Sequence, residues 1–264
     1  MSTAPNEPVL LRRDEARVAI LTLNRPHALN ALSGELIDAL QAEFDRLAKD
    51  KEIRCIVIEA KGRAFSSGHD LREVRSTDDY GFHFDLITRC SAMMMAIRRL
   101  PQPVIAKVHA IATAAGCQLV AACDLAVAST DAKFATPGVN IGLFCGTPSV
   151  PLGRNVGSKR ALDMLFTGEP INAETALRDG LVSRVVPAAE LDKATLELAS
   201  TIASKSPLVL AQGKELFHKH MAMDLEQAYA YATAYMAGAV TREDAKLGID
   251  AFVNKQGLPE WKGR

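Results

Sequence analysis

The sequence predicts an α/β fold, and three features support that prediction. A strand-like apolar run, a helix-like stretch and a second apolar run follow one another in residues 18–59. The same order returns in residues 103–128, with a spacing too irregular for a solenoid of fixed repeats. Beyond residue 186 the patterns are mainly helical. Alternating strands and helices are typical of an α/β domain, which here precedes a helical C-terminal region.

Hydrophobic periodicity defines the first unit. Residues 18–23, V-A-I-L-T-L, form a strand-like run that ends at the turn-like N-R-P. Ser33 is expected to cap a helix, because apolar residues recur after it at every third or fourth position. A strand is expected at residues 55–59, and a helix over about residues 82–99 should end before Pro101.

The second unit contains a stretch of very small residues. We expect a buried strand at residues 104–108, a helix that begins near Ala115 and a strand at residues 125–128. Residues 110–116 between them are mostly alanine, glycine and threonine, and such a turn lets a ligand touch the backbone. The first N–H groups of a helix also attract an anion or a polarised carbonyl oxygen. The alternative is that the small residues only allow close packing of helix and strand.

A similar stretch lies upstream, at residues 64–70, A-F-S-S-G-H-D, where it follows a strand-like run. Two backbone donors could therefore converge on one oxygen atom. After residue 170 we expect a helix at 173–179 ended by Gly180 and a strand at 182–186. Further helices are expected at residues 191–204, 207–219, 225–239 and 242–252.

Composition excludes several classes of function. The 264 residues include 31 basic and 31 acidic side chains, so no net charge favours nucleic acid or an anionic membrane as a partner. The longest apolar stretch, residues 104–127, is interrupted by polar and charged residues, so no transmembrane segment is expected.

The five cysteines form no C-x-x-C pair and have no His-rich partner segment, so we expect buried free thiols and no metal site. The start, M-S-T-A-P-N-E-P, has neither a signal-peptide nor a transit-peptide pattern, and the expected location is cytoplasmic.

Five motifs occur in a specific order: L-N-R-P-H-A-L-N-A-L from Leu23, A-F-S-S-G-H-D from Ala64, A-A-G-C-Q-L from Ala114, F-A-T-P-G-V-N-I-G-L from Phe134 and F-T-G-E-P-I-N-A-E from Phe166. With them the chain resembles the enoyl-CoA hydratase/isomerase, or crotonase, superfamily over about residues 9–255, and within it the enoyl-CoA hydratase domain-containing branch. The resemblance implies a crotonase spiral of ββα units with a C-terminal helical trimerisation region.

The same resemblance implies a core with a CoA-thioester site at residues 1–205 and an oligomerisation region at 206–264. The expected ligand is an acyl-CoA or enoyl-CoA of fatty acid metabolism, with CoA as part of the substrate and no tightly bound cofactor. The expected assembly is a homotrimer or a hexamer of two trimers.

The resemblance also assigns site residues. The backbone N–H groups of His69 and Ala115 would form an oxyanion hole that stabilises the enolate of the thioester. Phe252 and Lys255 of another subunit would approach the adenine and phosphate of CoA. The residues expected to line the CoA channel are Ala28, Leu29, Ala64, Ser66, Ser67, Gly68, His69, Asp70 and Leu71.

The chain departs from the family at the two glutamates that hydratases use for proton transfer, because these positions match Gln118 and Gly138. Glutamine can orient a water molecule but cannot carry a proton, and glycine has no side chain. We therefore expect weak or absent hydration, which the paired change Gln118→Glu with Gly138→Glu should restore. The alternative function is noncatalytic binding of acyl-CoA or a role in assembly.

Several other residues could replace the lost glutamates, although packing or surface roles compete with catalysis for each of them. These residues are Cys145, Asp70, Asp79, His83 and Asp85.

Overall fold

A computed structural model describes residues 7–264, which form two β-sheets and surrounding helices. The main sheet has the strand order β1-β2-β3-β5-β7-β10. Its pairs are parallel except for the antiparallel β1–β2 hairpin. Its strands are β1 (Leu10–Glu15), β2 (Val18–Leu23), β3 (Cys55–Ala60), β5 (Val104–Val108), β7 (Leu125–Ser129) and β10 (Arg184–Val186).

The second sheet is small, and its order is β4-β6-β8-β9. Each of its first three strands directly follows a strand of the main sheet, so the chain passes repeatedly from one sheet to the other before it enters a helix. This is the spiral of two strands and a helix that the resemblance implies. Its strands are β4 (Ala64–Ser66), β6 (Ile111–Thr113), β8 (Lys133–Ala135) and β9 (Ile171–Asn172).

Helices make up most of the remaining structure. The α-helices are α1 (Gly34–Leu47), α2 (Leu71–Val74), α3 (Tyr80–Arg99), α4 (Ala115–Ala122), α5 (Gly146–Asn155), α6 (Ser158–Thr167), α7 (Ala173–Arg178), α8 (Leu191–Ala203), α9 (Pro207–His220), α10 (Leu225–Ala239) and α11 (Glu243–Val253). Short 3-10 helices are η1 (Pro26–Ala28), η2 (Pro137–Ile141) and η3 (Ala188–Glu190).

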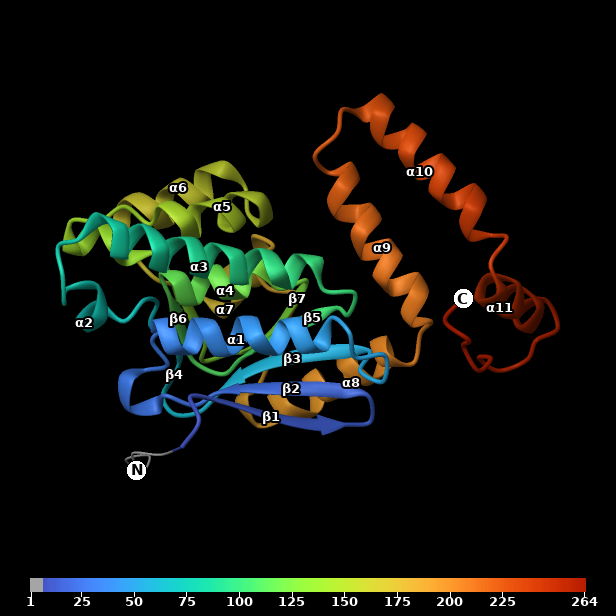
Figure 1. Cartoon of the computed structure of the whole chain (residues 1–264), viewed down its shortest axis with the longest axis horizontal. Coiled ribbons are helices and arrows are strands. Elements are labelled where there is room, and N and C mark those ends of the chain that lie inside the picture. The colour runs from blue at the N-terminus through green and yellow to red at the C-terminus, as the bar shows by residue number, and fades with distance from the viewer. Residues whose placement is uncertain (1–6) are drawn as a thin grey trace.

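The main sheet is covered on both faces, with α1 and α3 on one side and α8 on the other (Figure 1). Alternate residues of β2 show this division. Leu21 and Leu23 belong to the core that contains α1, α3 and α4, whereas Ile20 packs in a second core with Leu191 and Leu198 of α8. Burial on both faces explains why these parallel strands are continuous hydrophobic runs.

The last three helices have a different environment. Figure 1 shows α9 and α10 projecting from the core and α11 lying at the end of the molecule opposite β4 and α2. Large apolar side chains of α9 to α11 remain exposed, including Phe217, Tyr229, Met236 and Phe252.

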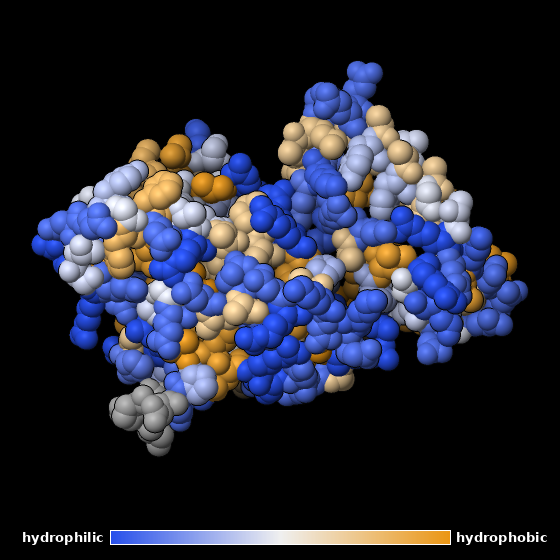
Figure 2. Space-filling view, viewed as in Figure 1, coloured by the Kyte–Doolittle hydropathy of each residue, from blue (hydrophilic) through white to orange (hydrophobic). Residues whose placement is uncertain are grey.

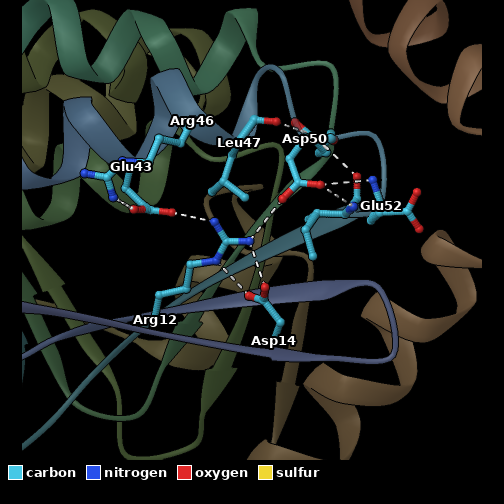
Figure 3. Close-up of polar contacts among 9 residues, drawn as sticks. Arg12, Asp14, Glu43, Arg46, Leu47, Asp50 and Glu52 are labelled. Atoms are coloured by element: carbon cyan, nitrogen blue, oxygen red, sulfur yellow. Dashed lines mark hydrogen bonds and ion pairs between the residues drawn. The ribbon is translucent and has the colours of Figure 1, made fainter.

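A network around Arg12 fixes the edge of the main sheet to α1 (Figure 3). The Arg12 guanidinium lies 2.8 Å from the Glu43 carboxylate in α1 and 2.7 Å from Asp14 in β1. It also lies 3.2 Å from Asp50 in the loop after α1. Glu43 is 6% exposed, so its negative charge depends on Arg12 and on its second partner, Arg46.

Most expected elements are confirmed. Ser33 caps α1 and accepts a hydrogen bond from the Leu36 N–H, and Gly180 has a φ of +89° beyond α7. The strand expected at 182–186 is shorter, because only residues 184–186 pair with β7. Part of the turn expected at 110–116 is strand β6, and α2, α5 and α6 were not predicted.

The five cysteines are buried and free, as expected. No helix in the described part of the chain is both long and apolar enough to span a membrane. The targeting expectation falls largely on residues 1–6, which lie outside the described residues.

Candidate functional site

Two turns meet at the edge of the second sheet, one between β4 and α2 and the other between β6 and α4. Their backbones approach so closely that a Cβ atom on Gly116 would lie 2.3 Å from the Ser66 carbonyl oxygen. A Cβ atom on Gly68, whose φ is +92°, would lie 3.1 Å from the Ala115 nitrogen. Glycine at both positions is therefore required for the contact.

The N–H groups of His69 in the first turn and of Ala115 in the second take no part in the hydrogen bonds of the described part of the chain. The Leu32 N–H donates to the Gly68 carbonyl at 2.7 Å, and the Asp70 N–H donates to the Leu32 carbonyl at 3.3 Å. His69 lies between Gly68 and Asp70, and its own N–H takes no part in these two hydrogen bonds. Ala115 is the first residue of α4 and its N–H has no intrahelical acceptor. Within residues 7–264 neither N–H group has an acceptor.

Ala114 holds the second turn in an unusual conformation. Its φ is +50° and its ψ is −120°, a combination that favours glycine. The Ala114 N–H donates to the Ala135 carbonyl at 2.9 Å, which fixes this backbone against β8. The sequence indicated small residues here but did not single out Ala114, because alanine carries no signal for a positive φ.

A third loop, which contains η1, supports the first turn. The Ser67 N–H donates to the Leu29 carbonyl at 3.1 Å, and the Ser66 hydroxyl donates to the Asn30 carbonyl at 2.9 Å. The Asn30 side chain donates in turn to the Ala64 carbonyl at 2.8 Å. Ala28 ends η1 beside Leu29, and Leu71 begins α2 with about half of its surface exposed. The structure thus brings together the CoA-channel residues expected from 28–29 and 64–71, with Asn30 as an unforeseen positioning residue.

Phe252 and Lys255 are not part of this assembly within one chain. Phe252 lies in α11 with 85% of its surface exposed, and Lys255 follows the helix with a φ of +54°. Figure 1 places α11 and the β4–α2 turn at opposite ends of the molecule.

The two positions that match the missing glutamates differ in the room they leave for a side chain. Gln118 lies one turn into α4, is 4% exposed, and its Oε1 has no hydrogen-bond partner in the described part of the chain. A Cβ atom on Gly138 would lie 2.5 Å from the Leu143 carbonyl oxygen and 2.9 Å from the Cys145 sulfur. A side chain at position 138 therefore requires the following loop to shift, and the restoration of hydration by Gln118→Glu with Gly138→Glu stays a prediction.

His69, Cys145 and Thr136 are uncharged at neutral pH. Burial lowers the pKa of His69, although Glu73 opposes the shift, and its Nε2 has no partner among residues 7–264. Burial raises the pKa of the Cys145 thiol more than a hydrogen bond from the Gly138 N–H lowers it. Thr136 was missed by the sequence analysis although it lies in the F-A-T-P-G motif; its side chain is fully buried and its hydroxyl has no partner in the same described residues.

The remaining acid-base candidates have structural partners. Asp70 caps α2 and lies 3.0 Å from Arg25, and its pKa is lowered because hydrogen bonds outweigh the effect of burial. Asp79 caps α3, and Asp85 pairs with Arg89 at 2.8 Å. The His83 Nε2 lies 3.1 Å from the Thr77 carbonyl oxygen. These contacts favour the structural alternative for each residue.

A cavity of about 1110 Å³ lies between the core and α9, and Figure 2 shows the surface hollowed beside the projecting helices. Among the predicted site residues that the structure describes, only Gln118 lines it. No group of three or more His, Cys, Asp or Glu side chains in residues 7–264 is arranged to hold a metal ion.

Comparison with known proteins agrees with this architecture. The sequence pattern of the enoyl-CoA hydratase/isomerase family matches residues 13–264. The chain is 46% identical over 249 residues to the rat (Rattus norvegicus) enoyl-CoA hydratase domain-containing protein 3, mitochondrial, covering 94% of this chain and 83% of the relative. The predicted branch is thereby confirmed.

Solved structures resemble this chain over nearly its whole length. An enoyl-CoA hydratase from Mycobacterium smegmatis superposes with a TM-score of 0.94 at 50% identity, over 97% of this chain and 99% of the other. Human enoyl-CoA hydratase domain-containing protein 3 superposes with a TM-score of 0.93 at 44% identity, over 96% and 100%. These likenesses confirm the crotonase fold.

One expectation is contradicted. The rat, mouse, frog and human relatives are all named as mitochondrial proteins, so the cytoplasmic location expected from the sequence is wrong. The fold, the sequence pattern and the relatives agree on one assignment. The chain belongs to the enoyl-CoA hydratase/isomerase family.

Proposed function

We propose that this protein acts on an acyl-CoA or enoyl-CoA thioester whose carbonyl oxygen accepts hydrogen bonds from the His69 and Ala115 N–H groups. The observation that carries this proposal is that both N–H groups lie on turns in backbone contact and have no acceptor within residues 7–264. Names of similar proteins supply the substrate class, because they describe enoyl-CoA hydratases.

Two donors at one oxygen stabilise the negative charge that develops when a thioester becomes an enolate. Because both donors are backbone groups, their positions depend on the turns and not on side-chain rotamers. Ala115 therefore serves in this role as well as glycine does.

The site lacks acid-base side chains at the two positions that hydratases use for proton transfer. A positioned acid or base contributes about 10²–10⁴-fold to a rate, and Gln118 and Gly138 supply neither. The unpaired Oε1 of Gln118 can accept a hydrogen bond from a water molecule, and its amide N–H can donate to the oxygen of the thioester. We therefore expect slow hydration of short enoyl-CoA substrates.

A second candidate function is noncatalytic binding of an acyl-CoA. The packing at Gly138 favours it, because the loop at 143–145 occupies the space that a second acid-base side chain would need. The raised pKa of Cys145 also leaves its thiol protonated at neutral pH.

A carbonyl-free ligand tests the proposed donors without a mutation. Calorimetry should show tighter binding of butanoyl-CoA than of S-butyl-CoA, a thioether that lacks the carbonyl oxygen. Two hydrogen bonds correspond to a difference of about fivefold to a hundredfold in Kd. Equal affinities would refute the role of the two N–H groups, and a lack of binding by both ligands would refute the assignment to CoA thioesters.

Hydration of crotonyl-CoA separates the two candidate functions. An enzyme should add the oxygen of labelled water to the β-carbon and a hydrogen to the α-carbon, giving labelled 3-hydroxybutanoyl-CoA, as measured by mass spectrometry. A noncatalytic binder should leave crotonyl-CoA unchanged at saturating ligand.

We further propose that the protein is a homotrimer or a pair of trimers. The many large apolar side chains that α9 to α11 expose support this assembly, because exposed apolar surface beyond isolated side chains marks contact sites. Phe252 and Lys255 would then reach the CoA of another subunit. A monomeric mass by light scattering at micromolar concentration would exclude it.

A further inference from the structure

The loop between β2 and α1, which contains η1, is held to the second sheet by Asn30. The Asn30 side chain is fully buried, and its amide group donates to the Lys61 carbonyl at 2.7 Å and to the Ala64 carbonyl at 2.8 Å. Its oxygen accepts from the Arg25 N–H at 2.9 Å, and the Asn30 N–H donates to the Arg25 carbonyl at 2.9 Å. These contacts fix the backbone of Arg25 relative to β4.

From this position the Arg25 guanidinium joins two other segments. Its Nη1 donates to the Ala31 carbonyl at 2.7 Å, and its Nη2 donates to the Asp70 carboxylate at 3.0 Å. The side chains of Arg25 and Asp70 are only 15% and 16% exposed. Solvent therefore screens this pair less than it screens an exposed ion pair, and the planar guanidinium holds both acceptors in a fixed geometry.

His69 lies between the two segments that Arg25 joins. Leu32 and His69 form a parallel β-bridge. Its hydrogen bonds run from the Leu32 N–H to the Gly68 carbonyl at 2.7 Å and from the Asp70 N–H to the Leu32 carbonyl at 3.3 Å. The second bond is longer than the usual range, so it constrains the Asp70 side of His69 only weakly. The Arg25 contact is a third link between the same segments, and it acts on that side.

Asp70 also connects the turn to α2. Its second carboxylate oxygen accepts from the Arg72 N–H at 3.1 Å, which caps the helix. One oxygen of the carboxylate is therefore bound to the loop and the other to α2. Loss of the Arg25 guanidinium leaves the cap and the two backbone hydrogen bonds in place. The turn can thus stay folded while the His69 peptide gains rotational freedom.

We propose that Arg25 is a positioning residue, which acts through Asp70 to hold the His69 N–H at the angle at which it shares one oxygen atom with the Ala115 N–H. The proposal rests on the proposed function, because it concerns the same two donors. A hydrogen bond weakens steeply as its donor angle decreases, so a modest rotation of the peptide is enough to lose the contact. Both terminal nitrogens of the guanidinium already have acceptors in the protein, so this role needs no contact between Arg25 and the ligand.

The test measures how much of the binding affinity depends on the thioester carbonyl. Calorimetry gives the ratio of the Kd of S-butyl-CoA, which lacks that oxygen, to the Kd of butanoyl-CoA. Arg25→Met removes the guanidinium and keeps an unbranched apolar stem. We expect this ratio to fall by about twofold to tenfold, which is the share of one hydrogen bond, while the Kd of S-butyl-CoA stays unchanged.

Arg25→Lys is the conservative variant. An ammonium group is a compact point charge that lacks the two-pronged geometry of a guanidinium, so lysine should hold Asp70 without also holding the Ala31 carbonyl. We expect a Kd ratio between those of the wild type and Arg25→Met. If Arg25→Met does not fold, the lowered ratio in Arg25→Lys carries the test, and a ratio equal to that of the wild type overturns the proposal.

Arg160→Met is the matched control. Arg160 in α6 lies 2.6 Å from Asp179, a carboxylate whose side chain is 16% exposed, as that of Asp70 is. This pair connects α6 to the end of α7 and has no contact with either turn. Its loss should lower the Tm and leave the Kd ratio unchanged, which separates a general loss of stability from the positioning of one N–H group.

Three results would count against the reasoning in different ways. An unchanged Kd ratio in a folded Arg25→Met protein would overturn the proposal. Equal weakening of both ligands would also overturn it, because it would indicate direct contact between Arg25 and the CoA moiety. A ratio of one in the wild type would instead refute the two-donor function on which the proposal rests.

Discussion

Replacement of Gly138 by alanine tests whether the site is closed to a second acid-base side chain. The added Cβ would lie 2.5 Å from the Leu143 carbonyl oxygen and 2.9 Å from the Cys145 sulfur. The first of these is backbone and cannot rotate away. The loop must therefore move as a unit.

The cost has two parts. Overpacking by one carbon atom costs about 1–3 kcal/mol. Movement of the loop also strains the 2.9 Å hydrogen bond from the Leu143 N–H to the Gly138 carbonyl, which contributes about 1 kcal/mol. A loss of about 2–4 kcal/mol corresponds to a decrease in Tm of roughly 5–15 °C for a chain of this size.

Differential scanning calorimetry measures this change, with Gly146→Ala as the control. Gly146 begins α5 and has no atom within 4 Å of an added Cβ, so its replacement should leave the Tm nearly unchanged. A Gly138→Ala protein with the Tm of the wild type would refute the packing argument. It would also support restoration of a hydratase by Gly138→Glu together with Gln118→Glu.

Three further predictions concern stability. Ala114→Gly should raise the free energy of unfolding by about 1 kcal/mol, because relief of the positive φ exceeds the added entropy of the unfolded chain. In the same urea titration, Ala42→Gly at an exposed position of α1 should lower the free energy of unfolding by about 1 kcal/mol. Burial would raise the pKa of Glu59, but hydrogen bonds from Arg13, Lys107 and Thr22 outweigh it and lower the pKa from 4.5 to about 2. The resulting stabilisation is about 1–3 kcal/mol after allowance for solvent screening; it is fully present above the unfolded pKa and is lost as the pH falls from about 5 to 2. Glu59→Gln should therefore make the free energy of unfolding less dependent on pH over this range. An equally steep dependence in the variant would contradict the assignment. Arg12→Met should lower the free energy of unfolding by about 1–2 kcal/mol, because it leaves the buried Glu43 with one partner fewer. Arg46→Met, at a position 69% exposed, is the control and should have a smaller effect. Equal effects of the two changes would argue against a special role for Arg12.

The sequence by itself determined most of the segments that form the helices and strands, and which backbone groups are candidate donors. These features depend on local patterns, such as the apolar spacing of α1, its cap at Ser33 and the glycine beyond α7. The motifs around His69 and Ala115 were likewise visible, because small residues at a helix N-terminus form a contiguous pattern. The missing glutamates were read directly from the identities of Gln118 and Gly138.

The tertiary structure alone decided how these segments meet. The contact of Gly68 with the Ala115 backbone joins residues that are far apart in the sequence, and the positive φ of Ala114 is imposed by its hydrogen bond to β8. The closure of position 138 by Leu143 and the cavity beside Gln118 depend on the packing of separate loops and helices. Such features have no periodic signal, because packing in a protein interior is set by the volumes of neighbouring groups in space and not by their order along the chain.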